Sequence, residues 1–278
     1  MQPLVSVIIP NYNSGNYLHE ALMSVFSQDY KSLEVIVVDD GSTDDSLSKI
    51  TEFSEQILLL KSENFGAASA RNIGILASKG QLIAFLDSDD LWVASKLSTQ
   101  VEILEENDLD LVYCSGQEFQ DESGLGSLQK AKYKGDCYQY FRKYPSRDIF
   151  AIGPSGVLLK KSLLKLSGIF DTAIPAPTED WDFFRRYSQY AKVGFSEKVL
   201  VLRRIHKDNI SRRSLVGYYN GNRNAILKMF IDDAQIGLKE RRIIWAKFHW
   251  ISSKSFLSNH DVLNGIRAVV RIFLPVLS

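Results

Sequence analysis

The sequence predicts an α/β fold in which a mixed, mostly parallel sheet carries helices on both faces and continues into a C-terminal helical extension. Short apolar runs alternate with segments of helical periodicity up to residue 115. The runs are largely apolar rather than alternating, which is typical of strands buried on both faces of a parallel sheet. At 278 residues and 45% hydrophobic content, the chain is long enough for one large α/β domain with an appendage.

The first part of the chain alternates between strands and helices. Strands are expected at 4–9, 33–38, 57–60, 82–86 and 109–115, and helices at 17–26, just after Gly41, 67–77 and 95–106. Ser42, Thr43 or Asp44 is expected to cap the second of these helices.

The second part is less regular. Between residues 117 and 147 the periodicity is lost, so an irregular stretch is expected. Beyond it, the expected elements are a strand at 157–159, a short helix at 162–166, a helix at 183–190, a strand at 199–205 and only helices after 214. The expected organisation is an α/β domain over 1–212 and a basic, amphipathic helical region over 213–278.

Cysteine content, charge and hydropathy narrow the class of protein. Only Cys114 and Cys137 are present, without zinc-like spacing, so a reducing, cytosolic setting is expected. No signal peptide is apparent, and no apolar run approaches the roughly 20 residues of a spanning helix. Residues 1–202 hold 19 Lys+Arg and 28 Asp+Glu, and residues 203–278 hold 14 and 5, so the net charges are −9 and +9.

The stretch from Gln81 to Trp92, QLIAFLDSDDLW, joins a buried strand to three carboxylates. Strand alternation places Asp87 and Asp89 on one side, where they can converge on a hard cation such as Mg2+ or Mn2+, and this cation could hold a diphosphate. The alternative is a solvated acidic turn with Asp90 as the N-cap of the next helix.

Polar clusters follow three of the expected strands. They read PNYN, DDGSTD and DSDD. Because ligands of parallel α/β sheets bind outside the carboxyl ends of the strands, we expect these clusters to gather at one edge.

In their order and spacing, these segments resemble family 2 of the glycosyltransferases, the nucleotide-sugar-dependent class with the GT-A fold. The resemblance covers about Val5 to Ser211, through VSVIIPNYN, EVIVVDDGSTDDS, GAASARNIGI, IAFLDSDDLW, TEDWDFFRR and RIHKDNIS. It implies inverting, metal-dependent transfer of a sugar from a nucleotide sugar to a hydroxyl of a glycan or lipid-linked acceptor, in surface polysaccharide or glycoconjugate synthesis. The sequence lacks the QxxRW motif of processive members, so addition of one sugar, or a few, is expected.

The donor nucleotide is expected at the ends of the first two strands. Asp40 is placed to accept a hydrogen bond from a pyrimidine imide N–H, while Pro10 offers a backbone group and Tyr12 a ring for stacking. This pocket suits uracil. The alternative for Asp39 and Asp40 is helix capping beside Gly41.

The diphosphate and the cation are expected near the central motif. The resemblance assigns Asp89 to the cation, Mn2+ or Mg2+, and places Asp87 and Ser88 on the donor side, near the ribose or the metal. Arg71 resembles the family arginine that reaches the base or the diphosphate; a surface ion pair is the alternative. His206 could ligate the metal or donate to phosphate, or it could be solvated.

The acceptor is expected at the acids that begin the helix near residue 180. Inversion needs one carboxylate as general base, and the resemblance gives this role to Asp180. Glu179 is expected to support it, and Trp181 to form an apolar wall for an acceptor sugar. The alternative is ordinary acidic charge at a helix N-terminus.

The basic tail has two interpretations. Its interleaved Trp and Lys or Arg residues suit helices lying on an anionic membrane surface, at the inner face of the membrane. Helices that pack on the core or on another copy of the chain fit equally well. Nucleic acid is a poorer fit, because no binding motif accompanies the charge.

Three other functions fit the sequence less well. A phosphatase of the haloacid dehalogenase type carries DxDx[TV] after its first strand, whereas Leu91 stands in the fifth position here and the motif follows the fourth strand. A dinucleotide dehydrogenase is not supported, since no GxGxxG follows a strand. A catalytically silent domain that binds a nucleotide sugar or glycan is the remaining alternative, against which Asp40, Asp89 and Asp180 argue.

Overall fold

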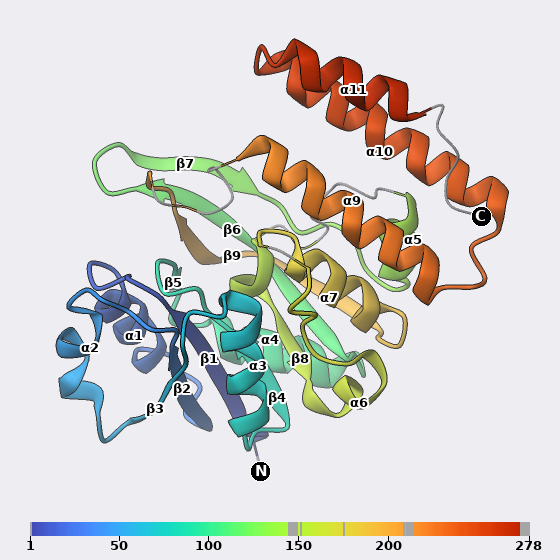
Figure 1. Ribbon diagram of the computed structural model, residues 1–278. Coiled ribbons are helices and arrows are strands. Elements are labelled where there is room, and N and C mark those ends of the chain that lie inside the picture. Colours follow the sequence, from blue (N-terminus) through green and yellow to red (C-terminus); the bar gives the residue numbers. More distant parts are fainter. Residues whose placement is uncertain are drawn as a thin grey trace.

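The computed structural model describes residues 2–143, 150, 152–174, 176–207, 209 and 214–272, which form a layered α/β structure (Figure 1). Nine strands of this part of the chain form one sheet in the order β3-β2-β1-β4-β8-β6-β9-β5, with β7 paired to β6 outside that path. The strands are β1 (Val5–Asn11), β2 (Leu33–Asp39), β3 (Ile57–Lys61), β4 (Leu82–Phe85), β5 (Leu91–Trp92), β6 (Leu111–Gln120), β7 (Gly124–Gln129), β8 (Leu158–Lys160) and β9 (Val193–Arg204). The α-helices are α1 (Leu18–Phe26), α2 (Ser46–Lys49), α3 (Ala67–Ala77), α4 (Lys96–Glu106), α5 (Cys137–Lys143), α6 (Leu164–Ser167), α7 (Glu179–Ser188), α9 (Leu215–Asp232), α10 (Leu238–Ser258) and α11 (Val262–Ile272).

The sheet is parallel in its first half and mixed beyond it. β1 pairs in parallel with β2 and β4, and β2 pairs in parallel with β3. β8 then runs antiparallel between β4 and β6, whereas β6 and β9 are again parallel. The predicted α/β architecture, with a mixed sheet between two helical layers, is confirmed.

Alternation along β4 divides the core into two layers. Leu82 and Ile83 point to opposite faces, because successive strand residues alternate. α1 and α4 cover one face, and α3, α5, α6 and α7 cover the other. α3 approaches β1 closely at Gly74, where a Cβ would lie 2.4 Å from Ile8 Cγ2.

The C-terminal helices extend the second of these layers. Ile226 of α9 and Phe248 of α10 belong to the same buried cluster as Phe183 of α7. α9 crosses the start of α7 at Gly221, where a Cβ would lie 2.4 Å from Thr178 Oγ1. None of the described helices combines the length and the hydropathy that are needed to cross a bilayer.

Helix α3 has its predicted bounds, and most other predicted elements differ only at their ends. Two element predictions are wrong. The stretch from 117 is not irregular, because β6 continues to Gln120 and is followed by β7 and α5; residues 144–147 of that stretch lie outside the described residues. β7 lacks an apolar pattern because it is exposed along nearly its whole length. The second helix, α2, is a single turn that begins at Ser46, and its N-cap position is Asp45, which is none of the three predicted caps. Asp44, one residue earlier, accepts the Ser46 N–H (3.0 Å).

Candidate functional site

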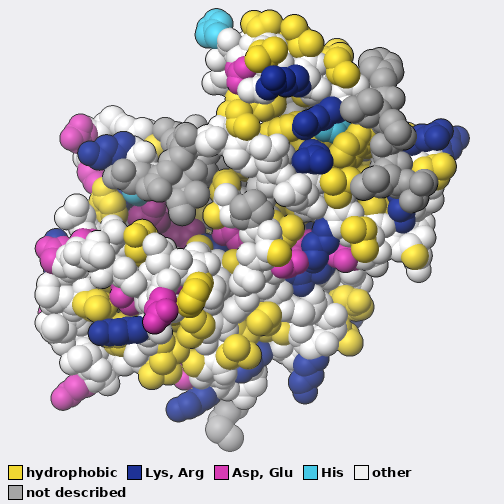
Figure 2. Space-filling view, in the orientation of Figure 1, with side chains coloured by type: hydrophobic (Ala, Val, Ile, Leu, Met, Phe, Trp, Pro, Cys, Tyr) yellow, Lys and Arg dark blue, Asp and Glu magenta, His cyan; other side chains and the backbone are white. Residues whose placement is uncertain are grey.

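Strand register brings the three polar clusters to one edge of the sheet. Asn11 lies opposite Asp39 in the β1–β2 ladder, and Ile8 lies opposite Phe85 in the β1–β4 ladder. The Asp40 N–H also donates to the Asn11 carbonyl (2.8 Å). The segments after β1, β2 and β4 therefore meet at the carboxyl ends of the strands. Figure 2 shows acidic side chains gathered in a recess of the α/β part.

Asp40 is buried at this edge and accepts three hydrogen bonds from the loop before α3. Its Oδ1 accepts from the Ser62 hydroxyl (2.5 Å) and the Phe65 N–H (3.0 Å), and its Oδ2 accepts from the Gly66 N–H (2.7 Å). Because an ionised carboxylate has about four acceptor positions, Asp40 retains capacity for one further N–H.

The residues near Asp40 differ in exposure and in hydrogen bonding. Tyr12 is 46% exposed, and its hydroxyl accepts from Asn64 Nδ2 (3.3 Å). Pro10 is partly buried at the end of β1. Asp39 is bound within the chain, since its oxygens accept from the Ser42 hydroxyl (2.5 Å) and the Ser42 N–H (3.2 Å). Asp39 therefore shapes the turn after β2, and it does not cap a helix, because α2 begins only at Ser46.

Arg71 of α3 joins the end of β4 to the start of α7. Its guanidinium is 5% exposed and donates to Asp87 Oδ1 (2.7 Å) and to Glu179 Oε1 (3.1 Å). Burial alone would lower the pKa of Arg71, but the two carboxylates outweigh it and raise this pKa. The alternative of a surface ion pair is wrong because the guanidinium is buried. Ser88 is also buried, and its hydroxyl donates to Ser14 Oγ (2.9 Å).

Asp89 lies against the imidazole of His206 and the carboxamide of Asn209. Asp89 Oδ2 is 2.9 Å from His206 Nε2 and accepts from Asn209 Nδ2 (3.1 Å). Asn209 Oδ1 accepts from the His206 backbone N–H (2.7 Å). Burial, followed by the charge of Asp87, raises the pKa of Asp89 despite the opposing effect of His206. Asn209 is a site residue that the sequence analysis missed, although it stands three positions after His206 in a segment of the resemblance.

Asp90 is not the predicted helix cap. The short strand β5 follows it, and α4 begins only beyond that strand. Asp90 Oδ2 accepts from the Ser155 hydroxyl (2.7 Å), and its Oδ1 accepts from the Arg204 N–H (3.1 Å). Burial, followed by the charges of Asp89 and Asp87, raises the pKa of Asp90 well above its ordinary value. Asp90 therefore fastens the acidic motif to β9.

The acids at the start of α7 differ in burial. Glu179 is 5% exposed and paired with Arg71. Asp182 is fully buried between the two arginines of its own helix; burial would raise its pKa, but their charges lower it. Asp180 is partly exposed, and its Oδ1 accepts the N–H of the next residue (2.7 Å). A Cβ on Gly153 would lie 3.5 Å from Asp180 Oδ2, so that glycine lines the approach to this carboxylate.

Trp181 lies in the core and not on an open wall. It is 4% exposed and packs edge-to-face on Phe141, with ring centroids 5.6 Å apart. The aromatic side chains of α7 pack into the buried cluster on this face of the sheet, so the indole has no open face. The expectation that Trp181 forms a wall for the acceptor sugar is therefore wrong, because its indole is buried.

Asp89, His206 and Asp87 are the described side chains best suited to a divalent cation. No group of three His, Cys, Asp or Glu residues in the described chain is arranged to enclose a metal. A cation that also binds substrate phosphates needs only one or two carboxylates from the protein. A carboxylate beside an imidazole, with a second carboxylate close by, fits that requirement.

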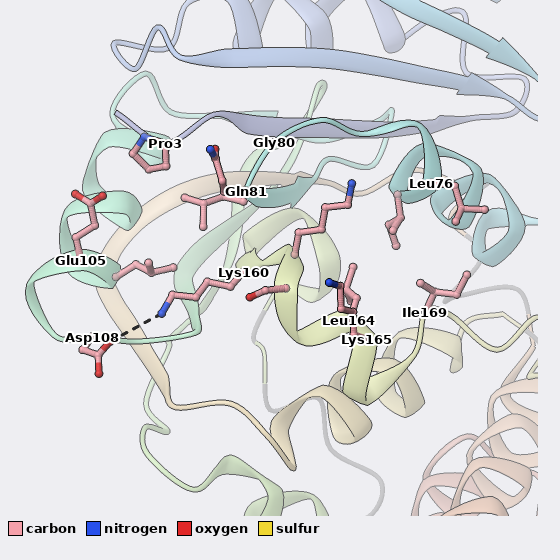
Figure 3. A pocket seen from close by; sticks show the side chains of 15 residues that line it. Pro3, Leu76, Gly80, Gln81, Glu105, Asp108, Lys160, Leu164, Lys165 and Ile169 are labelled. Atoms are coloured by element: carbon pink, nitrogen blue, oxygen red, sulfur yellow. Dashed lines mark ion pairs between the residues drawn. The ribbon is translucent and has the colours of Figure 1, made fainter. Parts of the chain in front are cut away.

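The cavity in Figure 3 lies away from these residues. Its volume is about 870 Å³, and it opens between Gln81, Leu104, Lys160 and Leu164, at the other end of β4. No candidate site residue lines it.

Comparison with known proteins gives relatives in sequence. Residues 6–167 match the family model described as glycosyl transferase family 2. An uncharacterized glycosyltransferase of Rickettsia typhi is 34% identical over 222 residues, which are 77% of this chain and 67% of that protein. The Escherichia coli UDP-Glc:alpha-D-GlcNAc-diphosphoundecaprenol beta-1,3-glucosyltransferase WfgD is 36% identical over 135 residues, 47% of this chain and 53% of that protein.

Two solved structures share the fold. Staphylococcus aureus TarS 1–349 in complex with UDP-GlcNAc has a TM-score of 0.71 at 20% identity, covering 98% of this chain and 82% of that one. Mannosyltransferase PcManGT from Pyrobaculum calidifontis, in complex with GDP-Man and Mn2+, has a TM-score of 0.65 at 21% identity, covering 97% and 75%. At these identities the likeness establishes a GT-A-like fold and nothing finer.

Proposed function

The chain belongs to glycosyl transferase family 2, and on this premise we propose that it transfers a single sugar from a UDP-linked donor to a hydroxyl of a lipid-linked or glycan acceptor, with inversion. The chain is a glycosyltransferase, and its E. coli relative is named for UDP-glucose and a diphosphoundecaprenol-linked acceptor. A similar acceptor would place the reaction at the cytoplasmic face of a membrane, in surface polysaccharide or glycoconjugate synthesis.

The observation that carries the proposal is the buried ion cluster around Arg71. It holds the DSDD segment after β4 beside the acids that begin α7. A donor diphosphate at the first segment and an acceptor hydroxyl at the second would then be neighbours, as a displacement reaction requires.

On the donor side, Asp40 and Tyr12 suit a uracil base. The remaining acceptor capacity of Asp40 fits the imide N–H, and the exposed Tyr12 ring offers a stacking face. Asp87, Ser88 and Arg71 would lie beside the ribose and diphosphate.

Asp89 and His206 would hold Mn2+ or Mg2+, and Asn209 would keep the Asp89 side chain and the His206 backbone in place. When bound, the cation neutralises charge on the departing nucleoside diphosphate. Arg204 Nε donates to the Asp89 carbonyl (3.1 Å), which fixes the backbone of the motif.

Asp180 would accept the proton of the acceptor hydroxyl as that oxygen attacks the anomeric carbon. Glu179 and Asp182 are held in buried ion pairs with arginines, whereas Asp180 is partly exposed. Glu179 supports the reaction indirectly, by holding Arg71 in place.

Replacing Asp180 by Asn tests the assignment, because the amide has the same size but accepts no proton. We expect the D180N protein to retain UDP-sugar binding, measured by thermal stabilisation, and to lose about 10²–10⁴-fold in transfer rate. Asp89→Asn should weaken both. Asp45→Asn is the matched control, because Asp45 is an exposed acid in the loop that follows β2. It should change neither binding nor transfer.

Two results would contradict the proposal. Transfer at the parental rate by the D180N protein would remove Asp180 from the role of base. A product that keeps the anomeric configuration of the donor would exclude a single displacement with inversion.

A further inference from the structure

Helix α11 is packed with its large apolar side chains facing outward. Its buried positions are the small residues Gly265 and Ala268, and a Cβ on Gly265 would lie 2.9 Å from Leu257 of α10. Four of its large apolar side chains are exposed by more than half, at Val262 (56%), Leu263 (59%), Ile266 (55%) and Val270 (54%). A helix that packs only on its own protein shows the opposite arrangement.

Helix α10 adds a second exposed row. Its core-facing side carries Phe248 and Phe256, which are buried. The outward positions recur at helical spacing and alternate between apolar and basic side chains, at Ile243, Lys247, Trp250, Lys254 and Leu257. The Lys254 ammonium lies 5.0 Å from the centre of the Trp250 ring.

The two rows meet at Leu257, which is exposed and also contacts α11. Figure 2 shows hydrophobic side chains gathered over this hairpin, with Lys and Arg among them. Residues 238–272 contain 7 Lys+Arg and 2 Asp+Glu, a net charge of +5. An apolar face with interspersed lysines and an exposed tryptophan has the chemistry of a helix that lies in the interface of an anionic bilayer.

We propose that the outward faces of α10 and α11 bind the surface of a membrane that contains anionic lipids. A second copy of the chain is a poorer occupant of this face. A two-fold contact would gather Lys247, Lys254 and Arg267 of both copies in one interface, where residues 238–272 supply only two acids, Glu240 and Asp261. The proposal stands independently of the sugar-transfer assignment, since it rests only on this surface.

Membrane contact here would also orient the catalytic part. α9 connects the hairpin to α7 through ion pairs of Arg185 with Asp232 (2.8 Å) and of Lys228 with Asp182 (3.3 Å). The helix that carries Asp180 would therefore be held in a fixed relation to the bilayer.

Sedimentation with vesicles tests the proposal on the full chain. We expect binding at low salt to vesicles of mixed phosphatidylglycerol and phosphatidylcholine, and little binding to phosphatidylcholine alone. Leu263→Glu with Ile266→Glu should abolish binding. Lys247→Glu with Lys254→Glu should weaken it by at least about tenfold, given the attraction of each basic residue to an anionic surface.

Two controls separate this face from general effects. Leu125→Glu with Leu128→Glu changes two other exposed apolar positions, on β7, and it should leave binding unchanged. Trp250 provides a local signal, because it is 52% exposed while Trp92, Trp181 and Trp245 are 4%, 4% and 7% exposed. A blue shift of fluorescence on vesicle addition should be lost in Trp250→Phe.

Failure of the unaltered chain to bind anionic vesicles at low salt would overturn the proposal, as would binding that the α10 and α11 substitutions leave intact. A vesicle-free dimer, seen in analytical ultracentrifugation and lost in L263E with I266E, would instead assign the face to a second copy.

Discussion

Asn209 shows how one side chain can organise a candidate cation site. It donates to Asp89 and accepts from the backbone of His206, so it fixes the two proposed ligands relative to each other. Residues that orient ligands in this way commonly contribute 10–100-fold to metal affinity.

We expect Asn209→Ala to weaken the affinity for Mn2+ by about 10–100-fold, so that UDP binding requires a correspondingly higher Mn2+ concentration. Folding should change little. The measurement is a Mn2+ titration at a fixed UDP concentration, in which calorimetry detects the binding. Asn107→Ala is the control, since Asn107 is an exposed carboxamide that bonds only to the end of α4 in the described structure. An unchanged Mn2+ requirement would exclude an orienting role for Asn209.

Lys96 is a buried amine without a carboxylate partner among the described residues. Its Nζ lies 3.4 Å from the Val157 carbonyl and 3.8 Å from the centre of the Trp92 ring. Burial lowers the pKa of Lys96 from 10.5 to about 7. Between those values the unfolded chain binds the proton that the folded chain has released, so stability rises with pH across this window.

We therefore expect the free energy of unfolding of the parent to rise by about 1.5 kcal/mol relative to Lys96→Met between about pH 7 and pH 8.5. The upper pH is kept below 9.0, the ordinary pKa of a thiol. Burial also raises the pKa of Cys114, so titration of this thiol would add its own change in stability at higher pH. Urea unfolding at both pH values measures the difference. Lys79→Met, at an exposed lysine, should show no such change, and a parallel pH response in parent and K96M would refute the expectation.

The sequence could indicate residues at strand ends, because strand order in a parallel sheet places those ends together. Asp40, Asp87 and Asp89 were found in this way. Their partners could not be found, since Ser155, Asn209 and Arg204 come from segments whose position depends on tertiary packing. Whether Trp181 is buried also depends on which side of α7 faces the sheet. The acidic residues at the start of α7 do not indicate which side that is.

At the scale of elements, Arg71 connects α3, the end of β4 and the start of α7. Removing the guanidinium would leave Asp87 and Glu179 facing each other with no compensating charge. Loss of one partner from a buried ion cluster typically costs 3–5 kcal/mol.

We expect Arg71→Met to lower the free energy of unfolding by about 3 kcal/mol, and added Glu179→Gln to restore part of it, because the stranded charge is then removed. Lys49→Met disrupts an exposed ion pair and should cost less than about 0.5 kcal/mol. Urea unfolding of the parent, Arg71→Met, Glu179→Gln, their double variant and Lys49→Met provides the measurement. Strictly additive losses in the double variant would show that the cluster is not coupled.

Elements with strong apolar periodicity were predictable, and those that packing alone stabilises were not. α3 follows helical spacing over its whole length and has the predicted bounds. β7 is an exposed strand stabilised by its pairing with β6, so no apolar pattern marks it. The long C-terminal helices were predictable as helices, but the outward direction of the α11 apolar face was not.

At the scale of the whole molecule, charge is divided between the two ends of the chain. Residues 1–202 carry a net charge of −9 and contain the acidic segments of the candidate site, which read DDGSTD, DSDD and TEDWD. A nucleoside diphosphate entering that recess would meet carboxylates more often than ammonium or guanidinium groups, and Arg71 is already neutralised by two acids. Electrostatics therefore oppose diphosphate binding unless a cation accompanies it.

We expect UDP to bind at least about 100-fold more weakly in excess chelator than with Mn2+, since the cation supplies the positive charge that Asp89 and its neighbours lack. Calorimetry with UDP and with uridine separates the causes. Uridine has no diphosphate, so its affinity should be the same with and without the metal. Equal UDP affinity in chelator would remove the metal bridge from the proposed site. A parallel loss of uridine binding would instead show that the metal acts on the base pocket, and would place the cation away from Asp89.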